Sequence, residues 1–253
     1  AALPRMAPIA SAFSPLSNFA LKFGYLFGFD KTRRLPDFQK PYSGPEGGDV
    51  LLFADTFNRH FDPETLRAAE RVISATGKTV GVISAPGRPL CCGRTHLSTG
   101  QTDRAKQELQ RTTDAFRAAL DAGKTIVGLE PSCTLMFKQE LPLMFPDEAD
   151  VQLVKDAMWD PFEYLVARNK DGLLKNDFKV ELGKVSYHVP CHLRVQNVGK
   201  KTAETLQMIP GTEVNVVERC SGHAGTWGVK KEFHETAMKI GKPVFKNMAK
   251  IFP

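Results

Sequence analysis

At 253 residues, with 42% apolar and 25% charged residues, the chain has the composition of a soluble globular protein, built as one large domain or two fused halves. No apolar run is long enough to cross a bilayer. The net charge of +6 is mild. The lysines near the C-terminus recur at helical spacing among apolar residues, which favours a solvated helix face. We therefore expect no nucleic-acid partner.

Cysteine usage indicates a reducing compartment. Five cysteines is an odd number, and their spacing is not that of a small secreted disulfide framework. Residues 1–5 lack the charged and hydrophobic segments of a secretory signal. We expect a cytoplasmic protein, and leave open a peripheral association with the inner face of the membrane. Both ends of the sequence resemble the edges of a processed or truncated polypeptide.

Residues 1–48 form a distinct segment that is rich in Phe, Pro, Gly and Ser and ends in the turn-rich stretch 41–48. Its aromatic residues show little regular period. This is typical of an arm or linker that packs on another surface, either the body of this chain or a partner. The same aromatic residues are the main indication of membrane contact in the sequence.

From residue 49 onward, strand and helix signals alternate, which predicts parallel sheets covered by helices. The first half, 49–182, has strands at 50–54, 78–85 and 124–129, and helices at 63–75, 99–122, from 132 onward and at 151–168. The second half, 183–253, has strands at 184–189 and 213–217, and helices at 193–208 and 230–249. The expected fold class is α/β, with two pseudo-repeated halves whose short, mostly parallel sheets are flanked by helices.

The two halves look like one unit used twice. The strand and turn at 51–56 align with 186–191, and a helix and a strand then lead to a short cysteine motif in each half. These motifs are Cys91-Cys92-Gly93-Arg94 and Cys220-Ser221-Gly222-His223. The alignment pairs Thr56 with Cys191. Open α/β sheets bind ligands beyond the carboxyl ends of their strands, so the motifs lie where a site is expected.

All the cysteines lie where a predicted strand gives way to a loop or helix. They are Cys91, Cys92, Cys133, Cys191 and Cys220. Cysteines used only for packing would not be restricted to such places, and a disulfide between adjacent thiols is strained. Metal binding therefore explains the set better than packing or nucleophilic catalysis.

Two kinds of metal site are compatible with these residues. One is a mononuclear zinc, iron or haem site. Its ligands would be Cys191, His192, Cys220 and His223. That site gives the adjacent Cys91 and Cys92 no role. An iron–sulfur cluster draws thiolates from several loops and accounts for that pair as well as Cys133.

Four motifs, in order, resemble those of a known family. They are Cys91-Cys92-Gly93-Arg94, Pro131-Ser132-Cys133, Pro190-Cys191-His192 and the stretch 220–228. Over about 49–253 the chain is similar to the twin cysteine-rich CCG domains found in the B subunit of heterodisulfide reductase and in the C subunit of anaerobic glycerol-3-phosphate dehydrogenase. The resemblance implies a 4Fe-4S cluster, cubane or non-cubane, in each repeat. It also implies electron transfer between a flavoprotein dehydrogenase and a quinone or disulfide acceptor.

The chain departs from the family pattern of Cys, Cys-Cys and Cys-x-x-Cys in each repeat. Thr56 replaces the leading cysteine of the first repeat and Glu130 replaces the first member of its Cys-x-x-Cys pair. Ser221 replaces one vicinal cysteine of the second repeat, whose closing pair would lie just beyond the last residue. One cluster could use the three cysteines of the first half with an oxygen or nitrogen ligand, or draw on both halves. Alternatively the centres are lost and the fold persists as a docking scaffold.

Other polar residues lie beside the cysteines. His96 follows the vicinal pair and could hydrogen-bond a sulfur, which would tune a reduction potential. His192 and His223 adjoin the second-half cysteines as ligands or supporting groups, and Arg94 is a candidate charge partner for an anionic cluster. His60, by contrast, is predicted to be solvated.

Together these features predict an iron–sulfur electron-transfer subunit or domain of a redox or respiratory dehydrogenase assembly, rather than its catalytic subunit. The chain has no recognisable acid–base or nucleophilic motif, and no glycine-rich dinucleotide fingerprint follows the first strand. A mononuclear metal site and a cofactor-free interaction scaffold remain the alternatives.

Overall fold

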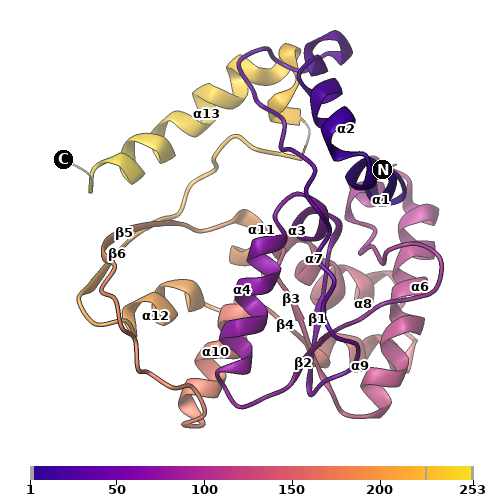
Figure 1. Cartoon of the computed structure of the whole chain (residues 1–253), viewed down its shortest axis with the longest axis vertical. Coiled ribbons are helices and arrows are strands. Elements are labelled where there is room, and N and C mark those ends of the chain that lie inside the picture. The colour runs from indigo at the N-terminus through magenta and orange to yellow at the C-terminus, as the bar shows by residue number, and fades with distance from the viewer. Residues whose placement is uncertain (1–2, 226, 252–253) are drawn as a thin grey trace. The chain divides into compact units, whose positions relative to one another are not determined.

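Parallel β-sheets organise both halves of the chain in the computed structural model, which describes residues 3–225 and 227–251 (Figure 1). Two compact units can be distinguished. Unit 1 comprises Ala1–Ser14 and Phe38–Lys175, and unit 2 comprises Pro15–Asp37 and Asn176–Pro253. The predicted α/β class, with short parallel sheets and flanking helices, is confirmed. Among the described residues, no helix is long and apolar enough to cross a membrane.

The central strand of unit 1 is β1 (Val50–Phe53), an uninterrupted apolar run that is buried throughout. β2 (Val80–Val82) pairs with one edge of β1 and β3 (Thr125–Gly128) with the other, while β4 (Met158–Trp159) pairs with β3. All of these pairs are parallel, in the order β2-β1-β3-β4. Because the chain steps to one side of β1 and then to the other, a ligand crevice is expected at the carboxyl ends of β1 and β3.

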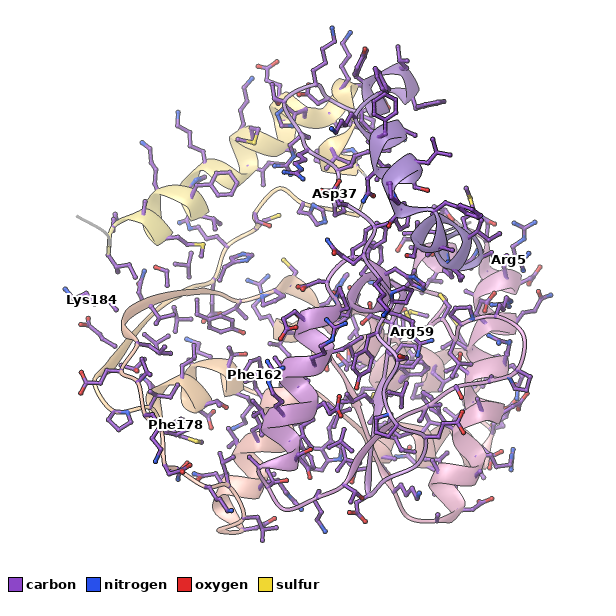
Figure 2. All side chains as sticks on the ribbon, in the orientation of Figure 1. Arg5, Asp37, Arg59, Phe162, Phe178 and Lys184 are labelled. Carbon is purple, nitrogen blue, oxygen red and sulfur yellow. The ribbon has the colours of Figure 1, made fainter. Side chains whose placement is uncertain are left out.

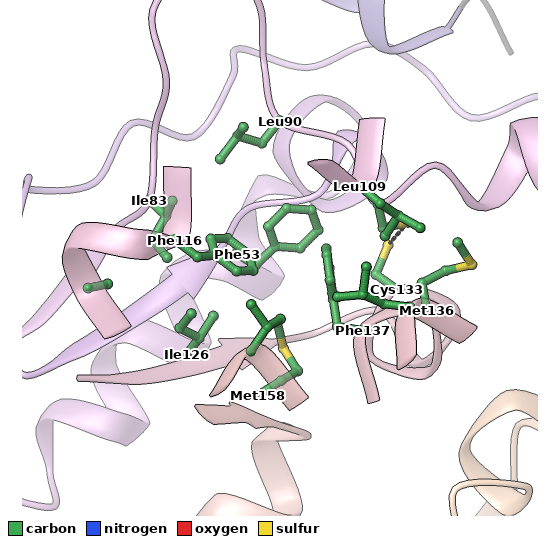
Figure 3. Packing of buried hydrophobic residues seen from close by; sticks show 14 of the residues in the cluster. Phe53, Ile83, Leu90, Leu109, Phe116, Ile126, Cys133, Met136, Phe137 and Met158 are labelled. Atoms are coloured by element: carbon green, nitrogen blue, oxygen red, sulfur yellow. Dashed lines mark hydrogen bonds between the residues drawn. The ribbon is translucent and has the colours of Figure 1, made fainter. Parts of the chain in front are cut away.

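Helices cover both faces of this sheet. On one face lie α6 (Thr102–Asp121), the π-helix η2 (Met136–Glu140) and α9 (Ala149–Ala157), and on the other lie α4 (Pro63–Ser74) and α10 (Pro161–Lys170). The ring of Phe53 lies edge-on to Phe116 at 5.9 Å and to Phe137 at 5.3 Å (Figure 3). The remaining helices are α1 (Leu3–Ala12), α3 (Thr56–His60), α5 (Arg94–Ser98), α7 (Pro131–Leu135) and α8 (Leu141–Met144).

Unit 2 is built on the parallel pair β5 (Gly183–His188) and β6 (Thr212–Val217). Its helices are α2 (Ser14–Leu21, in unit 2 from residue 15), η1 (Gly24–Phe27), α11 (Cys191–Arg194), α12 (Lys201–Gln207), η3 (Trp227–Val229) and α13 (Lys231–Ala249). The Ser186 hydroxyl donates to the Met248 carbonyl at 3.0 Å, which fastens β5 to the end of α13. The Asp30 amide donates to the Val229 carbonyl at 2.8 Å and joins the segment after η1 to the end of η3.

The prediction of one continuous helix over 151–168 is wrong in the middle of that range. α9 ends at Ala157, β4 follows, and α10 begins at Pro161. The Asp160 carboxylate accepts hydrogen bonds from the backbone amides of Phe162 and Glu163, and the Glu163 carboxylate accepts one from the Asp160 amide. This reciprocal capping box, with proline in the first turn, starts a new helix inside an otherwise helical pattern.

The helix predicted over 193–208 is also interrupted. α11 ends at Arg194 and α12 begins at Lys201. Between them Asn197 has a φ of 56° and Gly199 a φ of 83°. These left-handed backbone conformations cannot continue a right-handed helix, so the segment splits into two short helices.

Candidate metal centre

Three cysteines of unit 1 come together at the carboxyl ends of its strands. Cys91 and Cys92 follow β2 and precede α5, whereas Cys133 lies in the first turn of α7, after β3. The Sγ atoms of Cys92 and Cys133 are 2.9 Å apart, as the dashed line in Figure 3 marks. Cys91 precedes Cys92 in the same loop, and all three side chains are buried. The structure thus gathers the three ligands predicted for the first half.

Helix α6 fixes the loop that carries the vicinal cysteines. The Thr112 hydroxyl donates to the Cys91 carbonyl at 2.9 Å, and the Arg111 guanidinium donates to the carbonyls of Pro89 and Arg88. Gly93 has a φ of 78°, and a Cβ on it would come within 2.9 Å of the carbonyl oxygen of Ala105 in α6. Only glycine allows this close approach without strain. The Gly93 amide also donates to the Cys91 sulfur at 3.5 Å.

Two carboxylates lie at the same edge of the sheet. Asp55 caps α3, and its side chain accepts from the amides of Phe57 and Asn58 at 2.9 and 3.1 Å. Glu130 caps α7, and its side chain accepts from the amide and hydroxyl of Ser132. Burial raises the pKa of the Asp55 carboxyl, and the neighbouring Glu130 carboxylate raises it further. Sequence reasoning missed Asp55, although an acidic residue between a buried strand and a helix start is a recognisable signal.

The charges around the sulfurs favour a bound cation. The hydrogen bond with Cys92 lowers the pKa of the Cys133 thiol, but burial and the nearby Asp55, Glu130 and Cys91 outweigh it and raise that pKa to about 11. Hydrogen bonding to a neighbouring sulfur and then burial raise the pKa values of the Cys91 and Cys92 thiols well above their usual range. A metal ion reverses this balance, because its charge deprotonates a coordinating thiol.

The predicted supporting residues differ in their surroundings. Arg94 is ion-paired with Glu140 at 2.5 Å, and its guanidinium also contacts the Met136 sulfur at 3.6 Å. His96 is buried, and its Nδ1 has no hydrogen-bond partner among the described residues. A hydrogen bond from His96 to a cysteine sulfur therefore stays a prediction, while its unpartnered nitrogen is an orphaned polar atom.

The expectation for His60 was wrong. His60 is only 2% exposed, and its Nδ1 is hydrogen-bonded to the hydroxyl of Ser11 at 2.9 Å. Burial, and next the charge of Arg59, lower the pKa of His60 to about 4. The reason is the packing of α1 against α3, a contact between distant segments that the sequence around His60 does not reveal.

Unit 2 repeats the geometry with fewer donors. Cys191 begins α11 three residues after β5 ends, just as Thr56 begins α3 three residues after β1 ends, which agrees with the predicted alignment. Cys220 follows β6, and the Gly222 amide donates to its sulfur at 3.4 Å, as Gly93 does for its own cysteine in unit 1. Cys191 and Cys220, however, are exposed.

Neither unit holds its candidate ligands at metal-binding spacing. Within 3–225 and 227–251, no group of three or more His, Cys, Asp and Glu side chains is arranged to hold a metal ion. This includes the alternative set around His192 and His223. Two thiolates that bind the same metal ion tetrahedrally, through bonds of about 2.3 Å, lie roughly 3.8 Å apart. The sulfurs of Cys92 and Cys133 in unit 1 are closer, at 2.9 Å. The side chains are therefore of the right kind, and lie at the right edge of the sheet, for a metal centre bound by thiolates. Their sulfurs must move apart when the metal binds.

Comparison with known proteins identifies relatives along most of the chain. It is 28% identical over 201 residues to the C subunit of the anaerobic glycerol-3-phosphate dehydrogenase of Escherichia coli, covering 79% of this chain and 49% of that protein. It is 31% identical over 200 residues to the B subunit of the fumarate reductase (CoM/CoB) of Methanothermobacter marburgensis, covering 78% and 37%. It is 30% identical over 181 residues to an uncharacterized iron-sulfur protein of Methanococcus maripaludis, covering 70% and 32%.

The chain thus spans about half the length of the first of these relatives and about a third of the other two. No solved structure is significantly similar to it. The model of a family described as "Cysteine-rich domain", CCG, matches residues 54–138 and 185–251, which include all the cysteines. The chain therefore belongs to the cysteine-rich CCG domain family.

Proposed function

We propose that this chain is an iron–sulfur electron-transfer subunit or domain of a dehydrogenase assembly, with residues 49–182 and 183–253 as its two repeats. The observation that carries the proposal is the convergence of Cys91, Cys92 and Cys133 at the carboxyl ends of the parallel strands. Relatives whose names describe an iron-sulfur protein and dehydrogenase or reductase subunits support it. Cys191 and Cys220 would contribute to a second centre in unit 2.

In this role the protein residues would hold the centre, shield it and tune its potential. Cys91, Cys92 and Cys133 would bind as thiolates, and a 4Fe-4S cluster would supply one-electron storage. The buried side chains of Phe137 and Met136 beside Cys133 exclude water from this edge. The Gly93 amide, which already donates to the Cys91 sulfur, would stabilise the added negative charge of the reduced state and so raise the potential.

Anaerobic reconstitution with iron and sulfide tests the proposal. Wild-type protein should bind iron and acid-labile sulfide and give a low-temperature electron paramagnetic resonance signal when reduced. Cys91→Ser and Cys133→Ser should lose that signal, because each removes a buried thiolate. Val72→Ser, an exposed position on α4, is the control and should load normally. Wild-type protein that takes up neither iron nor sulfide, or takes up zinc alone, would refute the proposal.

For unit 2 a second candidate is a scaffold that keeps the fold without a cofactor. Ser221 in place of a cysteine and the exposure of Cys191 and Cys220 favour it. Cys220→Ser separates the two cases, since a scaffold would keep the wild-type resonance signal and iron content. A second centre in unit 2 would lose part of both the signal and the iron.

We further propose a flavoprotein dehydrogenase as electron donor, a quinone or disulfide as acceptor, and a cytoplasmic location on the inner face of a membrane. One relative is named as the C subunit of a dehydrogenase, which supports partner subunits. Support for the membrane comes from unit 2, where α2, η1 and the short link between them expose apolar side chains. These are Leu16, Phe19, Phe23, Tyr25, Leu26 and Phe27. Exposed basic residues accompany them, namely Lys22, Lys31, Arg33 and Arg34.

A further inference from the structure

The metal centre proposed for unit 1 lacks a fourth protein ligand. Iron–sulfur clusters of the 4Fe-4S type are usually held by four cysteine thiolates. The described residues of unit 1 supply three, Cys91, Cys92 and Cys133. If the proposed iron–sulfur function holds, on which this inference rests, another side chain of unit 1 can complete the set.

Two of the oxygen donors at this edge are poorly suited. The hydroxyl of buried Thr56 is neutral and does not ionise near neutral pH. Asp55 is buried, but both of its carboxylate oxygens are already used. Its Oδ1 accepts from two backbone amides, and its Oδ2 accepts from the Asn58 side chain at 2.6 Å. Recruiting Asp55 would therefore break the cap of α3.

Glu130 is held differently. Both hydrogen bonds from Ser132, through its amide and its hydroxyl, go to Oε1 of Glu130. They fix the direction of the carboxylate and leave Oε2 for another partner. Glu130 precedes Cys133 by three residues and caps the helix on which Cys133 lies. As the N-cap, its side chain folds back over the first turn of α7, the turn that contains Cys133. Glu130 follows the end of β3 by two residues, at the same edge of the sheet as Cys133.

We propose that the Glu130 carboxylate, through Oε2, is the fourth ligand of the metal centre formed by Cys91, Cys92 and Cys133. A carboxylate carries the same single negative charge as a thiolate, so the net charge of an all-cysteine centre is kept. Iron accepts carboxylate as well as thiolate ligands. The oxygen ligand would make one iron chemically distinct from the three that sulfur holds.

The test uses the full chain, reconstituted anaerobically, with Glu130→Gln and Glu130→Cys. Glu130→Gln keeps the shape but removes the anionic donor, so it should lose about one iron in four and, after mild oxidation with ferricyanide, give the resonance signal of an oxidised three-iron cluster. Glu130→Cys should retain all the iron and show a resonance spectrum different from wild type. Glu148→Gln, an exposed carboxylate of the same unit, should match wild type in both respects.

The outcomes separate this inference from the proposed function. If wild-type protein binds no iron with sulfide, both fail together. If wild-type protein loads but both Glu130 variants keep its iron content and spectrum, only the assignment of Glu130 is overturned. A loss of one iron in Asp55→Asn but not in Glu130→Gln would overturn it in favour of Asp55. Glu130→Cys guards against a folding defect in Glu130→Gln, because a fully loaded Cys variant with an unchanged spectrum also contradicts the proposal.

Discussion

The Sγ atoms of Cys92 and Cys133 lie 2.9 Å apart, although 41 residues separate the two cysteines. Cys92 comes from the loop after β2 and Cys133 from the first turn after β3. These strands flank β1 on opposite sides, so the order of the sheet rather than the local sequence brings the sulfurs together. The thiols thus meet beyond the carboxyl ends of the strands, where a parallel sheet places its ligands.

This proximity predicts how the metal-free protein oxidises. With hydrogen peroxide as oxidant, the two thiols of Cys92 and Cys133 should lose their hydrogens to form one disulfide while the peroxide is reduced to two molecules of water. Peptide mapping under non-reducing conditions should find this cross-link in wild type and in Cys91→Ser. It should disappear in Cys133→Ser, and iron–sulfur loading should protect against it. A dominant Cys91–Cys92 link would contradict the geometry.

The sequence could predict that these cysteines meet, but not everything around them. The buried run Val50–Phe53 and the cysteine motifs after later strands are local signals, and parallel strands bring such ends to one edge. The burial of His60 could not be predicted, because it depends on Ser11, which is 49 residues away. The break at Asn197 depends on a left-handed backbone conformation that asparagine permits but does not require.

Two adjacent threonines of α6 should respond oppositely to the same substitution. Both are buried, but the Thr112 hydroxyl donates to the Cys91 carbonyl, whereas the Thr113 hydroxyl has no hydrogen-bond partner among the described residues. Thr112→Val should cost about 1–3 kcal/mol of unfolding free energy, because it leaves that carbonyl unpaired. Thr113→Val removes an unpaired polar group and should be neutral or stabilising.

Urea unfolding at neutral pH measures both threonine variants. Thr112→Val should also slow cluster reconstitution, because the loop of Cys91 loses an anchor. Equal destabilisation by the two substitutions would mean that valine packing, not the hydrogen bond, determines the result.

Glycines at the two cysteine motifs should be far less replaceable than an ordinary turn glycine. Gly93, Gly222 and Gly100 all have positive φ, between 74° and 78°. A Cβ added to Gly93 would lie 2.9 Å from a carbonyl oxygen, and one added to Gly222 would lie 2.0 Å from a carbonyl oxygen. A Cβ added to Gly100 would have no atom within 4 Å. Gly100→Ala should therefore cost only the backbone strain, about 1–2 kcal/mol. The other two should cost more, with Gly222→Ala the most destabilising in thermal unfolding.

The buried His60 predicts a loss of stability in mild acid. Its pKa is about 4 in the folded protein against an ordinary value of 6.5. Between these values the unfolded state binds more protons, so the contribution of His60 is complete above pH 6.5 and falls by about 3 kcal/mol as the pH drops to 4. Burial raises the pKa of Asp160 to about 6, which has the opposite effect in the same range.

The difference between wild type and His60→Gln isolates the histidine, since both proteins keep Asp160. Urea unfolding free energies measured from pH 7 to pH 4 should converge as the pH falls, because only wild type has a proton to take up at this position. Parallel curves would show that His60 does not stay neutral in the folded protein.

The exposed apolar side chains of unit 2 predict binding to anionic bilayers. Leu26 and Phe27 of η1 are 69% and 80% exposed, and the ammonium of Lys31 lies 5.3 Å from the centre of the Tyr25 ring. Side chains that end in nitrogen atoms also project from α13 of the same unit (Figure 2). Apolar residues beside basic ones suit the boundary between acyl chains and anionic headgroups.

Sedimentation with lipid vesicles tests this surface. Wild type should bind vesicles containing phosphatidylglycerol and bind phosphatidylcholine vesicles weakly, with binding reduced by salt, because lysine and arginine charges contribute. Leu26→Ser with Phe27→Ser should weaken binding at least tenfold, since two large side chains no longer enter the bilayer. Leu143→Ser, at an equally exposed apolar position of unit 1, is the matched control and should bind as wild type does. If the double variant binds like wild type, these residues have another partner, and a protein subunit would be the class of partner to examine next.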